Sequence, residues 1–215
     1  MQIESVLRAG PVIPVLQFHS VADGVAVSRA LSSGGVRVLE ITLRTPAALD
    51  VIHAVRDLAD DIFVGAGTVT RPEQFAAAKA AGARIAVSPG ITAELAQAAQ
   101  ESGLAWLPGV ATASEVLQAQ ALGYDCLKLF PAEAVGGVPL LKALYGPFAD
   151  VRFCPTGGIT AESAPAYLAL PNVLCVGGSW LTPPSLIARG DWDVITTLAR
   201  AASGLPRSHT KKGND

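Results

Sequence analysis

Short runs of apolar and β-branched residues recur along the chain at intervals of roughly 20 to 25 residues. Most runs are followed by a glycine, proline or threonine turn and then by an alanine-rich stretch with helical periodicity. The pattern predicts eight strands: Val12–Leu16, Val36–Leu43, Ile62–Gly65, Arg84–Val87, Ala105–Leu107, Cys126–Phe130, Val151–Cys154 and Val173–Val176. Helices are predicted between them, including Pro72–Ala81, Ala93–Glu101, Ser114–Leu122 and Ala161–Leu170, with stops at Gly82, Gly103 and Gly123.

Eight strands joined by helical crossovers favour a parallel sheet that closes into a barrel. We therefore predict a single α/β domain, a (β/α)8 or TIM barrel over residues 1–207, followed by a disordered polar tail at 208–215. An open doubly wound sheet is the alternative. It would place a G-x-G-x-x-G turn after the first strand, where this chain has Pro14-Val15-Leu16-Gln17-Phe18.

Composition narrows the class of partner. Half of the 215 residues are hydrophobic, 16% are charged and the net charge is −2, which supplies one core and no basic surface for nucleic acid or anionic membranes. Neither a secretory pattern at Met1–Leu16 nor an apolar run approaching the ~20 residues of a membrane span is present. A small-molecule substrate fits best.

Three cysteines, Cys126, Cys154 and Cys175, lie in apolar stretches without C-x-x-C spacing. They are interpreted as buried thiols in a reducing cytoplasm. Neither metal-ligand spacing nor a Ser/His/Asp arrangement is found, and no cofactor is predicted.

Lys128 interrupts the apolar strand Cys126–Phe130. Side chains alternate along a strand, so Leu127 and Leu129 should face the helices while Lys128 faces the barrel axis. Burial disfavours an ammonium and can lower the pKa of a lysine from about 10.4 to near 7, which leaves an amine able to attack a carbonyl. The alternative is a lysine that reaches solvent or forms a structural ion pair.

Glu40, Thr42 and Arg44 share one parity on the second strand and its exit, so all three should point inward. An inward carboxylate beside an inward lysine is suited to proton transfer, and an arginine suits a substrate carboxylate. A structural ion pair of Glu40 with Arg44 or Lys128 remains the other interpretation.

Two glycine turns follow the last two predicted strands, Thr156-Gly157-Gly158 and Gly177-Gly178-Ser179. Barrel enzymes often bind phosphate there through backbone N–H groups. Tight turning alone would also explain them.

Six stretches together resemble the 2-keto-3-deoxy-6-phosphogluconate (KDPG) and 4-hydroxy-2-oxoglutarate aldolase family: Gly34–Thr45, Val64–Val69, Ser88–Gly90, Lys128–Glu133, Arg152–Ile159 and Gly177–Leu181. The resemblance runs from about Pro14 to Arg200. It implies a homotrimeric class I aldolase of the Entner–Doudoroff route, which cleaves the phosphorylated keto acid to pyruvate and glyceraldehyde 3-phosphate.

The resemblance also implies residue roles. Lys128 would form the Schiff base at C2, and Glu40 would move protons at the C4 hydroxyl and the enamine carbon. Arg44 and Thr68 would hold the carboxylate, and Pro89 and Phe130 would surround the pyruvyl carbons. Thr156 would form a hydrogen bond with the substrate. The phosphate would be held by Gly157, Gly158, Gly178 and Ser179. The loop Gln17–Ser20 departs from the family, whose members often carry lysines there, so no contact from it is carried over.

Several other functions stay open from the sequence. The same chemistry could act on 4-hydroxy-2-oxoglutarate or on 2-keto-3-deoxy-6-phosphogalactonate. A phosphate-sugar isomerase or a synthase on a similar barrel would not need Lys128, and a protein that only binds a phosphorylated ligand would not need both Lys128 and Glu40.

Overall fold

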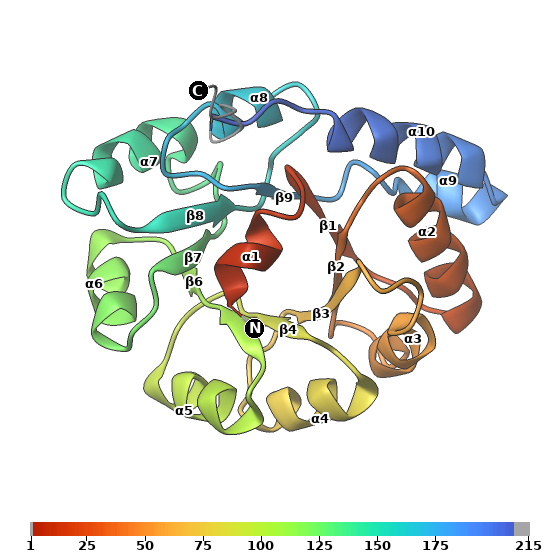
Figure 1. Ribbon diagram of the computed structural model, residues 1–215, viewed down its shortest axis with the longest axis horizontal. Coiled ribbons are helices and arrows are strands. Elements are labelled where there is room, and N and C mark those ends of the chain that lie inside the picture. The colour runs from red at the N-terminus through yellow and green to blue at the C-terminus, as the bar shows by residue number, and fades with distance from the viewer. Residues whose placement is uncertain (1, 209–215) are drawn as a thin grey trace, which may run out of the picture.

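The strands of the computed structural model, which describes residues 2–208, pair in parallel around a ring (Figure 1). Six strands form one sheet in the order β5-β4-β3-β2-β1-β9, with bounds β1 Val12–Leu16, β2 Val38–Thr42, β3 Phe63–Gly67, β4 Ile85–Val87, β5 Ala105–Leu107 and β9 Val176–Gly178. A second sheet has the order β6-β7-β8, with bounds Gly109–Val110, Cys126–Leu129 and Arg152–Pro155.

Two short connections close the ring. β5 and β6 are separated by a single residue, Pro108. Proline has no N–H to donate, so it interrupts the hydrogen-bond ladder there. Its carbonyl still accepts the N–H of Lys128 at 2.8 Å. Isolated parallel bridges, Phe153 with Val173 and Thr156 with Gly177, join the β8 side to the β9 side. With β5 and β6 acting as one barrel strand, the eight-stranded (β/α)8 fold is confirmed.

Helices surround the strands on the outside (Figure 1). Their bounds are α2 Val21–Ser33, α3 Ala48–Val55, α4 Glu73–Ala81, α5 Ala93–Ser102, α6 Ala113–Ala121, α7 Gly137–Tyr145, α8 Ala164–Leu168, α9 Pro184–Arg189 and α10 Trp192–Ser203. Gly82 and Gly103 end α4 and α5 in the left-handed conformation, as the sequence predicts.

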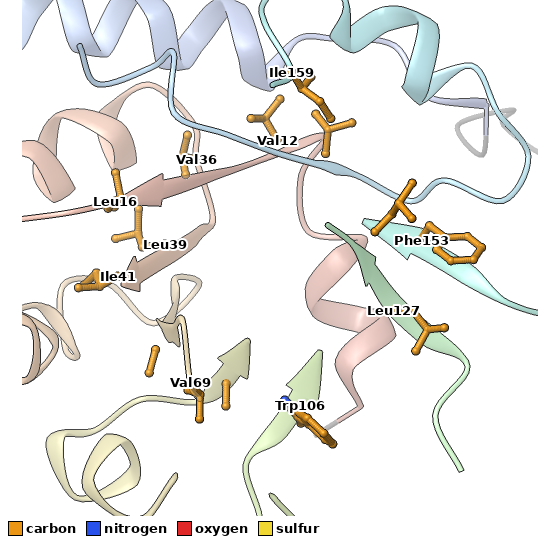
Figure 2. Packing of buried hydrophobic residues seen from close by; sticks show 14 of the residues in the cluster. Val12, Leu16, Val36, Leu39, Ile41, Val69, Trp106, Leu127, Phe153 and Ile159 are labelled. Atoms are coloured by element: carbon orange, nitrogen blue, oxygen red, sulfur yellow. The ribbon is translucent and has the colours of Figure 1, made fainter. Parts of the chain in front are cut away.

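Alternation along the strands sorts their side chains into two layers. Leu39 and Ile41 of β2 and Leu127 of β7 belong to the layer between strands and helices, part of which Figure 2 shows. Val38 and Cys126 belong instead to the barrel interior. The short helix α1, Ile3–Leu7, contributes Val6 and Leu7 to that interior cluster and lies across the ring of strands in Figure 1.

Two strands begin later than predicted, because the first residues of the apolar run are buried without pairing as a strand. The last strand begins at Val176 rather than at the predicted Val173. Val173 is fully buried but makes only an isolated bridge, and a hydrophobic run alone does not distinguish buried coil from strand. The second strand likewise begins at Val38 rather than Val36.

Cys126, Cys154 and Cys175 are free and buried, as expected. Burial raises the pKa of the Cys126 thiol to about 12 and that of Cys175 well above its ordinary value. Both thiols therefore stay protonated at neutral pH and act as core groups.

At the C-terminal end, one described residue of the predicted tail contacts the barrel. The polar tail predicted at 208–215 lies outside the described residues except for Ser208, whose hydroxyl donates to the carbonyl of Leu170 at 2.9 Å. Within residues 2–208, none of the helices has the length and apolar composition that crossing a bilayer requires.

Candidate active site

A buried pair of opposite charges lies inside the barrel. Nζ of Lys128, on β7, is 3.2 Å from Oε1 of Glu40, on β2. The two residues are 4% and 3% exposed. Both therefore face the barrel interior, as strand alternation predicts, and the ion pair that Glu40 forms is with Lys128.

A glycine on the neighbouring strand, two positions beyond the register partner of Glu40, makes room for the Glu40 side chain. Gly67 ends β3, which pairs with β2. A Cβ atom on Gly67 would lie 2.6 Å from Cγ and 2.9 Å from Cδ of Glu40, closer than such atoms can approach. The missing side chain at position 67 is therefore what lets the carboxylate reach Lys128.

Above the pair opens a cavity of about 240 Å³. It is lined by Val15, Leu16, Gln17, Thr42, Arg44, Lys128, Phe130, Thr156, Gly157, Gly158, Ile159, Gly177 and Ser179. These residues come from the carboxyl ends of the strands and the loops that follow, where barrel enzymes place their chemistry. Nζ of Lys128 also lies 5.2 Å from the centre of the Phe130 ring, within range of a cation–π contact.

Arg44 reaches the cavity from the exit of β2 and is held by Thr68. Nε of Arg44 donates to Oγ1 of Thr68 at 3.0 Å. Thr68 has a φ of +58°, a conformation that costs a residue other than glycine roughly 1–3 kcal/mol. The hydrogen bond keeps the Thr68 hydroxyl beside the exposed guanidinium of Arg44, which suits bidentate binding of a carboxylate.

The Thr156–Gly158 turn forms another wall. Gly157 and Gly158 have φ values of +106° and +80°, which favour glycine, and both line the cavity. Thr156 is buried, and a side chain on Gly177 would collide with it, since a Cβ there would lie 2.8 Å from Cγ2 of Thr156.

Not every predicted site residue lines the cavity. Gly178 does not, and a Cβ at this position would lie 2.8 Å from Cη2 of Trp180, which packs against the outer hydrophobic cluster. Pro89 does not line it either. Two hydrogen bonds fix the Ser88–Gly90 turn that contains Pro89. Nε1 of Trp106 donates to Oγ of Ser88 at 3.0 Å, and Oγ of Ser88 donates to the carbonyl of Gly90 at 2.6 Å. Their roles toward substrate stay predictions.

Some lining residues were not predicted as site residues. Thr42 had a signal, because it shares the parity of Glu40 and Arg44, and its hydroxyl donates to the carbonyl of Leu16 at 2.8 Å. Gln17 had none. It also lines a neighbouring cavity of about 540 Å³ that extends past Ser179 to His19 and α9. Among the described residues no cluster of three or more His, Cys, Asp or Glu side chains could hold a metal ion.

Comparison with known proteins identifies relatives over almost the whole chain. The family model of KDPG and KHG aldolase matches residues 3–198. A 2-dehydro-3-deoxy-phosphogluconate aldolase from Pseudoalteromonas atlantica is 50% identical over 93% of each chain.

Two solved structures are similarly close. A KDPG aldolase from Legionella pneumophila, with pyruvate captured as a covalent carbinolamine intermediate, has a TM-score of 0.92 and 46% identity, covering 95% of this chain and 99% of its own. The KDPG aldolase of Zymomonas mobilis with 3-phosphoglycerate has a TM-score of 0.91 and 47% identity, covering 96% and 97%.

Substituting Gly67 with alanine should displace Glu40 while leaving the outer packing of the barrel in place. We expect Gly67→Ala to lower turnover by about 100-fold, since a misplacement of about 1 Å at a reacting group can cost that much. Steady-state kinetics with a check of folding by circular dichroism measures this. Gly146→Ala is the matched control, because a Cβ there meets only ordinary contact. Equal turnover in the two variants would show that the clearance at Gly67 does not position Glu40.

Proposed function

Because the chain belongs to the KDPG and KHG aldolase family, we propose that it cleaves 2-keto-3-deoxy-6-phosphogluconate to pyruvate and glyceraldehyde 3-phosphate. It is a lyase that works through a Schiff base, without a metal ion or cofactor, and the substrate places it in the Entner–Doudoroff route. The buried pair of Lys128 and Glu40 below an open cavity carries the proposal. A structural ion pair has no need of a cavity above it, whereas a nucleophile and its proton carrier do.

The chemistry begins with a proton transfer within the pair. Glu40 lies close enough to take a proton from the Lys128 ammonium, and the amine then attacks the C2 carbonyl. Glu40 then returns this proton to the carbinolamine hydroxyl, which leaves as water, so that an iminium ion forms and Glu40 is again a carboxylate. A carbinolamine of this kind is the species captured with pyruvate in the Legionella pneumophila relative.

Cleavage then uses the iminium as an electron sink. Glu40 accepts the proton of the C4 hydroxyl, the C3–C4 bond breaks, and its electron pair moves into the enamine as the aldehyde leaves. Glu40 returns the proton to C3 of the enamine, and water hydrolyses the resulting iminium to release pyruvate and free Lys128. The interior below the pair is apolar, which strengthens its electrostatic interactions.

Substrate ends are recognised by different walls of the cavity. Arg44, fixed by Thr68, binds the carboxylate, and Thr156 donates a hydrogen bond to the substrate. Phe130, together with Pro89, shapes the space around the pyruvyl carbons. Backbone N–H groups bind the phosphate, in the turns that contain Gly157, Gly158, Gly178 and Ser179. Neither turn carries a lysine or arginine, so the N–H groups supply the positive end of the interaction.

The protein is further proposed to work as a homotrimer in the cytoplasm. Members of the family it resembles are usually trimers. Three free, buried cysteines fit a reducing compartment.

A second candidate substrate is 4-hydroxy-2-oxoglutarate, because the matching family includes enzymes that act on it. A pyruvate-release assay coupled to lactate dehydrogenase should rank the substrates by kcat/KM. We expect the 6-phosphogluconate-derived keto acid to exceed both 4-hydroxy-2-oxoglutarate, which lacks the phosphate, and the galactonate-derived epimer, because relatives 50% identical to this chain are 2-dehydro-3-deoxy-phosphogluconate aldolases. A higher kcat/KM for either competitor would assign the enzyme to that substrate instead.

Replacing Glu40 with glutamine should separate its proton-transfer role from its ion-pair role. Glu40→Gln keeps the size of the side chain and an acceptor for Lys128. We expect it to fold and to trap pyruvate slowly, with aldol turnover reduced by roughly 100- to 10,000-fold, the range for a positioned proton carrier. Turnover near that of the wild type would return Glu40 to a purely structural role.

A further inference from the structure

The loop that follows β7 is hydrogen-bonded to the Thr156–Gly158 turn of the cavity. Residues 131–137 close on themselves through hydrogen bonds from the N–H of Val135 to the carbonyl of Pro131 at 3.1 Å and from Gly137 to Ala132 at 2.9 Å. This loop then donates to the neighbouring turn, from Ala132 N–H to the Thr156 carbonyl at 2.8 Å and from Glu133 N–H to the Gly157 carbonyl at 3.1 Å.

The side chain of Glu133 supports the same turn directly. A Cβ atom on Gly158 would lie 2.7 Å from both Cβ and Cγ of Glu133, so the stem of Glu133 fills the space beside the glycine. Gly157 and Gly158 are both in the left-handed region, where the backbone of glycine is otherwise free to move. Contact with Glu133 limits that freedom.

Tyr167, on α8, fixes the carboxylate of Glu133. Its hydroxyl donates to Oε1 of Glu133 at 2.6 Å, and the residue is 2% exposed. A Cβ on Gly137 would lie 2.6 Å from this hydroxyl, so the missing side chain there makes space for it. Burial and the neighbouring carboxylate raise the pKa of Tyr167 above its ordinary value, which keeps the hydroxyl protonated as a donor.

We propose that Tyr167 and Glu133 are positioning residues that hold the Thr156–Gly158 turn in its anion-binding shape. The inference rests on the proposed function, in which this turn binds the substrate phosphate. Neither residue lines the cavity, and both act through the turn.

One physical effect gives the pair this role. Backbone N–H groups bind an anion well only when their directions are fixed before it arrives, because otherwise binding must order them. The hydrogen bond from Tyr167 fixes Glu133, and the stem and N–H of Glu133 fix the turn.

The test compares one phosphorylated substrate with its unphosphorylated analogue, 2-keto-3-deoxygluconate. Tyr167→Phe keeps the ring and removes the hydroxyl. We expect the KM for the phosphorylated substrate to rise by about tenfold, with kcat and the kinetics on the analogue changed less than about twofold. Tyr145→Phe, the same change at an exposed tyrosine of α7, should leave all values unaltered.

Variants of Glu133 complete the experiment. Glu133→Gln keeps both the stem and an acceptor for Tyr167 and should retain a KM near that of the wild type. Glu133→Ala removes the stem beside Gly158 as well as the acceptor, so its KM should rise at least as far as that of Tyr167→Phe. Combining Tyr167→Phe with Glu133→Ala should add no further loss to that of Glu133→Ala, because the Tyr167 hydroxyl then has no carboxylate to hold.

Three results would overturn the inference. Equal losses on both substrates would assign the pair to the fold, and an unchanged KM in Tyr167→Phe would remove its role altogether. A wild-type enzyme without any preference for the phosphorylated substrate would contradict the phosphate site and the inference with it. That last result comes from the wild type alone, so failure of the proposed function is separated from failure of the pair.

Discussion

Two opposite charges are buried 3.2 Å apart in this barrel, and most features of the site follow from keeping them there. Each ion pays a desolvation cost of several kcal/mol, so removing either partner would leave an uncompensated charge at a cost of roughly 3–5 kcal/mol. The approach of Glu40 to Lys128 depends on Gly67, whose missing side chain leaves the necessary space. Such a pair is costly as a source of stability, and the proposed function gives it a use as an amine beside a proton acceptor.

The barrel interior is divided at this pair. On one side, Val38, Cys126 and Cys175 pack with Val6 and Leu7 of α1 into an apolar cluster. On the other side lies the cavity, with polar groups at its walls. The apolar cluster excludes water from one side of the ion pair. The cavity on the other side has room for a small substrate. Gly157, Gly158 and Gly177 lie in the cavity walls, so part of the cavity surface is formed by backbone atoms.

How much of this could be predicted from the sequence depends on whether the interaction is local. Strand alternation predicted that Lys128 and Glu40 face inward, although 88 positions separate them, because parity along each strand is a local property. The start of β9 at Val176 was not predicted, since burial without pairing leaves the same apolar pattern. Two contacts depend on tertiary packing and left no signal in the sequence: the approach of Trp180 to Gly178, and the hydrogen bond of Tyr167 with Glu133.

The central claim is that Lys128 is the Schiff-base nucleophile. Incubation with pyruvate and borohydride, followed by peptide mass spectrometry, tests it most directly because reduction turns the imine into a stable secondary amine. A single adduct on Lys128 is expected, abolished in Lys128→Ala while the variant stays folded. An adduct on Lys79 or Lys142 instead, or no adduct with active enzyme, would contradict it.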